Sequence, residues 1–324
     1  MDFNKELIEN YIPGNQKNWT GRHTENSLQY WYQIIETENV TKKFSKANFG
    51  LIGYACDEGV RRNLGRVGAK NGPKNIRTKL AKIPFHFQDK KIIDFGDITC
   101  NDDKLENCQR SFSEVIGKLI SQKIIPIGLG GGHDIAYANF NGIKKGIKDF
   151  KNHKIGILNF DAHFDLRKTT NLSNSGTPFY QILSENNNVY YLPIGIQQQS
   201  NTKELYEIAA NNSVEFISNF DCSELTNQLK DKLQSFIDNI DYLYLTIDLD
   251  GFSSAYAPGV SAPSPLGFSP KFMYDIIPFI LKTHKVVSCD IAELNPKYDI
   301  DNHTATLAAR IIDCIVSNSK KTPF

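Results

Sequence analysis

Residues 154–167 read KIGILNFDAHFDLR and join a short apolar run to three ionisable side chains. The apolar run predicts a buried strand, and Asp161, His163 and Asp165 follow at the point where that strand would end. Because side chains at i, i+2 and i+4 of a strand point to one side, we expect the three to project together at the edge of an apolar core. Burying two neighbouring carboxylates is costly unless a cation neutralises them, so the stretch predicts a metal site.

Seven further apolar, β-branched runs predict strands in the rest of the chain. They are residues 49–55, 91–96, 123–130, 189–196, 214–218, 242–250 and 285–294. Helical patterns lie at residues 73–83, 105–121, 135–149, 203–211, 223–239, 271–283 and 303–317. Several strands are apolar throughout, which is typical of a parallel sheet covered on both faces. The alternation predicts one α/β domain over residues 1–324, with about eight strands and an irregular extension, residues 1–46, packed on it.

The composition gives no sign of a nucleic-acid-binding or membrane protein and favours a soluble one. The 324 residues include 37 basic and 36 acidic ones, so the chain has no basic excess for nucleic acid or membrane surfaces. No apolar run approaches the length of a membrane span, and the first residues lack the pattern of a signal peptide. We therefore expect a cytoplasmic protein. Its six cysteines are scattered without a CxxC pair and are expected to be ordinary thiols.

Two more predicted strands end in residues that could join the same metal site. In open α/β sheets, functional groups gather beyond the carboxyl ends of the strands. GLGGGHD at 128–134 places three glycines before His133, and TIDLDGF at 246–252 places Asp248 and Asp250 two residues apart. The glycine spacing matches neither the dinucleotide-binding pattern nor the P-loop pattern, so a nucleotide site is not indicated.

The charge and the ligand types of these candidates indicate two divalent cations. The full set is His133, Asp161, His163, Asp165, Asp248 and Asp250. Its four carboxylates match the charge of two divalent ions. Oxygen-rich coordination without cysteine favours Mn²⁺ or Mg²⁺, and the imidazoles favour Mn²⁺. Two such ions can share a water molecule and lower its pKa toward neutrality, which would supply a nucleophile for hydrolysis.

Taken together, four motifs resemble the signatures of the ureohydrolase superfamily, which comprises arginases, agmatinases and formimidoylglutamases. They are GGGHD (130–134), DAHFD (161–165), DLDGF (248–252) and AELNP (292–296). The resemblance extends over about residues 47–316. It implies an arginase-like, three-layer α/β/α fold with a central, mostly parallel sheet. It also implies two Mn²⁺ ions per subunit and a homo-oligomer, a trimer or a hexamer.

The resemblance also implies a role for each candidate ligand. The positions that match the ligands of one ion are His133, Asp161, Asp165 and Asp248, and those that match the other are Asp161, His163, Asp248 and Asp250. Asp161 and Asp248 would then bridge the two ions. Asp165 would also accept a hydrogen bond from a bridging hydroxide and take part in catalysis. Glu293 matches the acidic residue that holds the guanidinium or amidine group of the substrate, and it would also take part in catalysis by stabilising positive charge on that group.

Further segments resemble the formimidoylglutamase branch of the superfamily. They are residues 56–77, 164–167, 175–181 and 255–268. The implied reaction is cleavage of the formimidoyl C–N bond of N-formimidoyl-L-glutamate, in histidine degradation, to give L-glutamate and formamide. This substrate carries two carboxylates, for which arginine is the best bidentate partner. We therefore expect Arg167 and Arg62 to bind the carboxylates, with help from Asn63.

Ser175 distinguishes the chain from two other branches of the superfamily. Arginases and agmatinases carry a histidine at its place, so the serine argues against both, and we expect Ser175 to contact the substrate. The proton donor to the leaving group stays unassigned, with His303 or a water molecule as candidates. The alternatives are an agmatinase or guanidinobutyrase-type enzyme that releases urea, deacetylase chemistry on a related fold, and a non-catalytic family member that binds metal.

Overall fold

A computed structural model of the chain describes residues 9–25, 28–87, 89–101, 103–169, 172–320 and 323–324. Their centre is one sheet with the strand order β1-β4-β3-β5-β10-β9-β6-β7-β8, and β2 pairs with β4. The strands are Tyr11–Ile12 (β1), Glu36–Thr37 (β2), Phe49–Ala55 (β3), Ile92–Thr99 (β4), Ile125–Leu129 (β5), Ile155–Phe160 (β6), Val189–Ile196 (β7), Ile217–Ser218 (β8), Tyr242–Asp248 (β9) and Val286–Ala292 (β10). All pairs are parallel except β1–β4, which is antiparallel.

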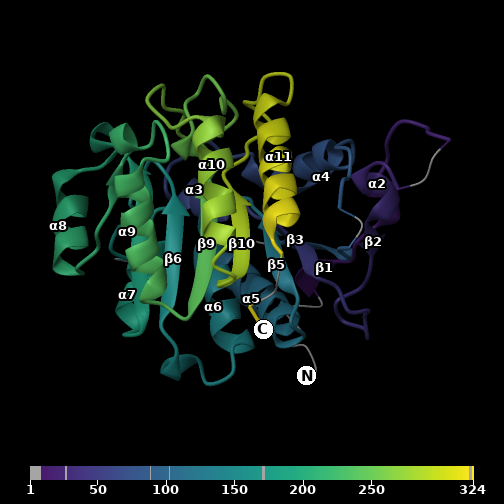
Figure 1. Cartoon of the computed structure of the whole chain (residues 1–324), viewed down its shortest axis with the longest axis horizontal. Helices are drawn as coiled ribbons and strands as arrows, with labels where there is room; N and C mark the ends of the chain where they lie inside the picture. The colour runs from purple at the N-terminus through teal and green to yellow at the C-terminus, as the bar shows by residue number, and fades with distance from the viewer. Residues whose placement is uncertain (1–8, 26–27, 88, 102, 170–171, 321–322) are drawn as a thin grey trace.

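Helices cover both faces of this sheet (Figure 1). They are Trp31–Ile34 (α2), Glu58–Arg62 (α3), Gly72–Leu80 (α4), Leu105–Ser121 (α5), Ile135–Gly146 (α6), Pro178–Glu185 (α7), Lys203–Asn211 (α8), Asn227–Asp238 (α9), Pro270–Leu281 (α10) and His303–Asn318 (α11). One apolar core gathers side chains of α4, α9, α10 and α11, and a second gathers those of α5, α6, α7 and α8. The result is the three-layer α/β/α architecture that the resemblance implies.

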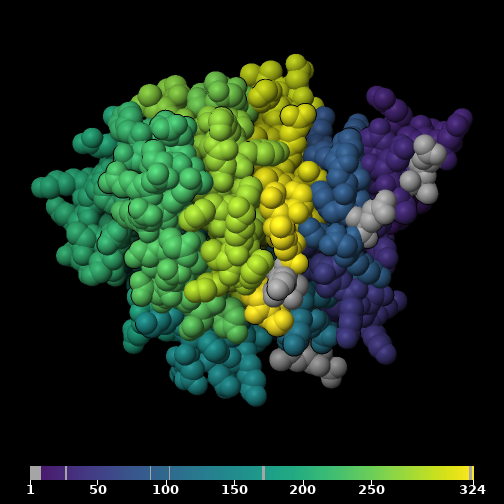
Figure 2. All heavy atoms as spheres, in the orientation of Figure 1, coloured from purple at the N-terminus to yellow at the C-terminus, as the bar shows by residue number. Residues whose placement is uncertain are grey.

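Local chemistry explains where several of these helices begin. The Ser269 hydroxyl accepts a hydrogen bond from the Phe272 N–H at 3.2 Å, and Pro270 occupies the first turn of α10. Thr226 caps α9 in the same way through the Leu229 N–H. Figure 2 shows α9, α10, α11 and α4 as a continuous layer over the viewed face. No helix in the described part of the chain is long and apolar enough to cross a membrane.

The eight predicted strands are all present, but the sheet is larger than predicted. The two-residue strands β1 and β2 come from the N-terminal segment and pair with β4. They are too short to show a period in the sequence. The helices α2, α3 and α7 were also not predicted, since α2 and α3 span barely a turn and α7 overlaps residues 175–181, which were noted only for their resemblance to a family segment.

The strand order places four functional strand ends side by side. The central strands β5, β10, β9 and β6 are neighbours, and all run in the same direction. Their carboxyl ends therefore meet at one edge of the sheet, which is where α/β folds place their functional groups. His133, Glu293, Asp248 and Asp161 lie at or just beyond these four ends.

Candidate metal centre

His133 reaches the site through a glycine turn that tolerates no side chain. A Cβ atom on Gly131 would lie 1.8 Å from the carbonyl oxygen of Cys56. The same carbonyl accepts the N–H of Gly132 at 2.9 Å. The glycines therefore let the chain after β5 pass close to the end of β3, and this path places His133 beyond the sheet.

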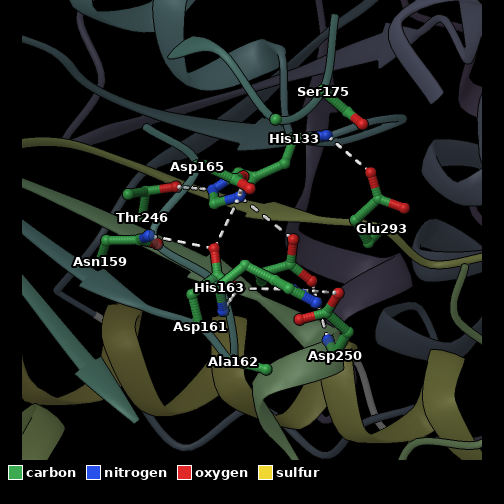
Figure 3. A network of polar contacts seen from close by, with 12 residues as sticks. His133, Asn159, Asp161, Ala162, His163, Asp165, Ser175, Thr246, Asp250 and Glu293 are labelled. Atoms are coloured by element: carbon green, nitrogen blue, oxygen red, sulfur yellow. Dashed lines mark hydrogen bonds and ion pairs between the residues drawn. The ribbon is translucent and has the colours of Figure 1, made fainter. Parts of the chain in front are cut away.

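One imidazole nitrogen of His133 faces three carboxylates (Figure 3). Its Nδ1 atom lies 3.1 Å from Asp161 Oδ2, 2.9 Å from Asp165 Oδ2 and 3.1 Å from Asp248 Oδ2. These four residues form a group whose ligand atoms all lie within 4.8 Å of one another. Three carboxylates around one nitrogen are what a divalent cation with mixed nitrogen and oxygen ligands requires.

The opposite nitrogen of His133 fixes which tautomer the ring adopts. Nε2 lies 3.0 Å from the Thr246 hydroxyl, and that hydroxyl donates to Asp290 Oδ1 at 2.6 Å. Since the hydroxyl proton is used on Asp290, the Thr246 oxygen accepts from the Nε2–H of His133. A neutral ring then turns the lone pair of Nδ1 toward the three carboxylates. Acceptors that face one another at about 3 Å repel, unless a cation lies between them.

A second group lies on the other side of Asp161. His163 Nδ1 is 3.4 Å from Asp161 Oδ1 and 3.2 Å from Asp250 Oδ2. Asp161 thus faces each group with a different oxygen, as a bridging ligand would. Asp248 belongs to the first group, and its Oδ1 accepts the Asp250 N–H at 2.8 Å. The structure therefore brings all six candidate ligands together, although Asp248 is not part of the second group of potential ligands.

The pKa values of the clustered side chains indicate an excess of negative charge. Burial, with the carboxylates of Asp250 and Asp161, raises the pKa of Asp248 to about 7. Burial and Asp161 raise the pKa of Asp165 to about 6. Burial would lower the pKa of His133, but Asp248 and the other facing carboxylates raise it well above its usual value. The cluster takes up protons to balance its charge, and divalent cations would do the same.

Two buried oxygens at the site also lack partners. Asp250 Oδ1 and Glu293 Oε2 are buried without a hydrogen-bond partner among the described residues. An unpartnered buried carboxylate oxygen is costly, so each indicates a missing ligand. For Asp250 a cation would satisfy the oxygen. Glu293 is not a member of either group of metal-ligand candidates, so its oxygen is suited to a substrate N–H.

The expected strand geometry of DAHFD was wrong, although the side chains converge. β6 ends at Phe160, and the following residues leave the sheet. Asp165 has a φ of +49°, in the left-handed region. The turn is held by the Asn201 side chain, which donates to the Ala162 carbonyl and accepts from the Phe164 N–H. Irregular backbone, rather than strand alternation, aims these side chains at one point.

Asp250 departs from the same expectation. It lies in the 3₁₀ turn Leu249–Gly251 that follows β9, rather than on the strand with Asp248. The N–H of Asp250 caps back onto the Asp248 carboxylate, which fixes both side chains relative to each other. The i, i+2 spacing therefore works here through a capped turn.

Residues that support the ligands were missed by the sequence reasoning. Asn159 donates to Asp161 Oδ2 at 3.0 Å and to the Tyr191 hydroxyl at 2.9 Å. Thr246 and Asp290 position His133, as described above. All three lie within predicted strands. A polar side chain inside an otherwise apolar central strand was the one signal that could have identified them.

We expect Thr246→Val to weaken metal binding by about 10–100-fold, because it removes the acceptor that orients His133. Thr246→Ser keeps the hydroxyl and is expected to bind metal like the unmodified protein. The measurement is a titration with Mn²⁺ that follows bound metal. Equal affinities of the valine and serine variants would show that the hydroxyl does not orient the ligand.

A cavity of about 340 Å³ opens onto the ligand cluster. Its lining includes Asn63, Leu64, Gly65, Arg66, His133, His163, Asp165, Arg167, Ser175, Ser200, Leu205, Asp248, Asp250, Ser261, Ala262 and Glu293. Glu293, with a φ of +69°, accepts the His133 N–H at 2.8 Å through Oε1. Its free Oε2 is thus held at a fixed position beside the metal-ligand candidates.

Arg167 lies on the wall of this cavity with Asn63 and Ser175. The Asn63 amide donates to the Ser175 hydroxyl at 3.1 Å, and the Arg167 side chain passes close to Gly176. The Arg167 side chain is exposed and makes no hydrogen bond or ion pair with any described residue. An unpaired guanidinium at the mouth of an acidic cavity can bind a substrate carboxylate.

The expectation for Arg62 changes with the structure. Its guanidinium lies 2.8 Å from Glu58 and 2.6 Å from Glu106, and it is absent from the cavity lining. Its hydrogen-bonding capacity is already used, so it does not offer a free site for a substrate carboxylate. His303 lies at the start of α11 and lines a different cavity, beside Tyr256 and Tyr274. It is therefore not placed to protonate a leaving group at the metal-ligand cluster.

Comparison with known proteins agrees with this architecture. Residues 47–317 match the Arginase family. The chain is 39% identical to the formimidoylglutamase of Clostridium tetani, over 96% of this chain and 97% of that protein. It is 40% identical to the formimidoylglutamase of Legionella pneumophila strain Lens, over 94% of this chain and 97% of that protein.

Solved structures show the same fold at lower identity. The formimidoylglutamase of Bacillus subtilis has a TM-score of 0.82 at 21% identity, covering 94% of this chain and 96% of that one. Trypanosoma cruzi formiminoglutamase with Mn²⁺ has a TM-score of 0.76 at 23% identity, covering 85% of this chain and 94% of that one. Sequence match and fold therefore agree over most of the chain: it belongs to the arginase family.

Proposed function

We propose that this chain is a binuclear manganese hydrolase that cleaves the formimidoyl C–N bond of N-formimidoyl-L-glutamate, giving L-glutamate and formamide. The observation that carries the proposal is the shared cavity. Most of the metal-ligand candidates line this cavity together with Arg167. The unpaired guanidinium of Arg167 suits a substrate carboxylate. The names of the relatives at 39–40% identity support the same reaction.

The proposed ligands are those expected from the sequence. His133, Asp161, Asp165 and Asp248 would hold one ion, and Asp161, His163, Asp248 and Asp250 the other, so that Asp161 and Asp248 would serve both. Bound manganese would supply Lewis acidity and lower the pKa of a nearby water molecule. The Trypanosoma cruzi relative, whose structure contains Mn²⁺, supports this choice of metal.

The chain's own side chains would orient the substrate. Glu293 Oε2 is buried, unpartnered and fixed through Oε1, so it can accept an N–H of the amidine. Arg167 would bind a carboxylate at the other end of the substrate, with Asn63 and Ser175 lining the space between them. Asp165, which lies 2.9 Å from His133 Nδ1, would take a proton from the attacking water and pass it to the departing amine.

We expect Mn²⁺ to stabilise the folded protein, because the ligand cluster exists only in the folded state. At about 100 times its dissociation constant, a ligand adds about 2.7 kcal/mol, which corresponds to a rise of roughly 5 °C in the unfolding temperature. Thermal unfolding with Mn²⁺, and after dialysis against a chelator, measures the difference. An unfolding temperature that does not depend on Mn²⁺ would contradict the metal proposal.

Product analysis tests the reaction itself. Mn²⁺-loaded protein would be offered formimidoylglutamate, arginine, agmatine and guanidinobutyrate in parallel. We expect formamide and glutamate from the first compound and no urea from the others. Urea from a guanidino compound would assign the chain to an agmatinase or guanidinobutyrase-type activity. No turnover with both ions bound would favour a non-catalytic family member.

A further inference from the structure

Three of the six cysteines meet in the structure, although they are separated in the sequence. Cys56 directly follows β3, Cys100 directly follows β4, and Cys108 lies in α5. Ala55 and Thr99 are partners in the parallel pair β3–β4, so the cysteines that follow them leave the sheet next to each other. The three sulfur atoms lie within 4.8 Å of one another.

The cluster combines two buried thiols with one that reaches solvent. Cys56 and Cys108 are fully buried, and Cys100 is half-buried. Hydrogen bonds from Cys108 and Cys56 hold the pKa of the Cys100 thiol well below its usual value, and the Arg62 guanidinium adds to this effect. A thiolate is the form of cysteine that binds metals, and the half-buried position gives an ion a route to it.

The three sulfur atoms lie close enough together for one metal ion to bind all of them. Metal–sulfur bonds of about 2.3 Å place the three sulfur atoms of a trigonal site about 4 Å apart. A disulfide would join two of the sulfur atoms and leave the third without a role. We propose that Cys56, Cys100 and Cys108 form a separate site for a soft, thiolate-binding cation of the Zn²⁺ or Cu⁺ type. Binding would release the remaining thiol protons to solvent.

This site is chemically distinct from the His/Asp cluster. Its ligands are all sulfur, which selects soft cations, whereas the six other candidates offer oxygen and imidazole nitrogen. The two are linked through one strand-end contact, because the Cys56 carbonyl accepts the N–H of Gly132, the residue before His133. The cysteine proposal does not depend on the proposed reaction.

The test is a titration of the reduced, full-length, Mn²⁺-loaded protein with Cd²⁺ as a stand-in for Zn²⁺. Thiolate–Cd²⁺ charge transfer absorbs in the ultraviolet, whereas oxygen and nitrogen ligands give no such band, so Cd²⁺ at the His/Asp cluster stays silent. We expect the band to saturate at one equivalent. Cys100→Ser removes the half-buried ligand and is expected to abolish this stoichiometric step.

Cys222→Ser is the matched control. Cys222 is a buried thiol that donates to the Ser218 carbonyl at 3.3 Å, a bond that a serine hydroxyl can replace. This variant is expected to keep the full Cd²⁺ band.

Three outcomes would overturn the proposal. The first is no sulfur band at one equivalent in the unmodified protein, a result that needs no variant. The second is an unchanged titration in Cys100→Ser. The third is a disulfide between two of these cysteines after peroxide treatment of a protein that binds no Cd²⁺, which would identify a redox pair instead.

Discussion

Asp161→Asn is expected to abolish hydrolysis and to prevent either metal site from filling. Asp161 faces His133 with Oδ2 and His163 with Oδ1, so it is the residue that both groups of ligand candidates share. An asparagine has nearly the same shape but carries no charge, and it offers a single oxygen. Activity should fall toward the uncatalysed rate, since enzymes accelerate their reactions by about 10⁶-fold or more.

The measurements are bound Mn²⁺ per chain and kcat/KM for formimidoylglutamate. Asp161→Asn is expected to lower both, with a circular dichroism spectrum like that of the unmodified protein. Asp221→Asn is the control, because Asp221 is an exposed aspartate outside the cavity. An Asp161→Asn variant that keeps two Mn²⁺ ions and its activity would refute the bridging role of Asp161.

The strands and the ligands at their ends could be predicted from the sequence because the signals are local. Apolar runs such as KIGILNF mark a central parallel strand, and Asp161 follows such a run directly. Asp165 shows the limit of this reasoning. Its own backbone lies in the left-handed region, and the turn that leads to it is anchored by Asn201, far along the chain. The predicted position was right and its geometric reason was wrong.

Interactions between distant segments could not be predicted in this way. Arg62 was expected to bind substrate, but Glu106, 44 residues away, occupies its guanidinium. The support that Thr246 gives to His133 and the meeting of Cys56 with Cys108 also depend on strand order. A single sequence shows residue types and spacing along the chain. The neighbours of a side chain across the sheet appear only in the structure.

Arg167→Ala is expected to raise KM for formimidoylglutamate by roughly 10–100-fold, because a hydrogen-bonded charged pair contributes about 1.5–3 kcal/mol. The guanidinium lines the cavity wall and is not part of the metal-ligand cluster, so it should bind ground state and transition state alike and leave kcat nearly unchanged. Arg167→Lys keeps the charge but loses the bidentate fork, and we expect an intermediate KM. Steady-state kinetics with saturating Mn²⁺ separates the two parameters.

Arg62→Ala is the matched comparison, since it removes an arginine from the same expected pair. Arg62 is engaged by Glu58 and Glu106. Its loss should therefore lower the unfolding temperature and leave KM nearly unchanged. If Arg62→Ala raised KM as strongly as Arg167→Ala, then Arg62 would have to exchange its partners for substrate.

If Arg167→Ala left KM unchanged, Arg66 would be the next candidate for binding the substrate carboxylate. It lines the cavity, but its guanidinium already donates to the carbonyls of Ser261 and Val260, so substrate would have to displace them.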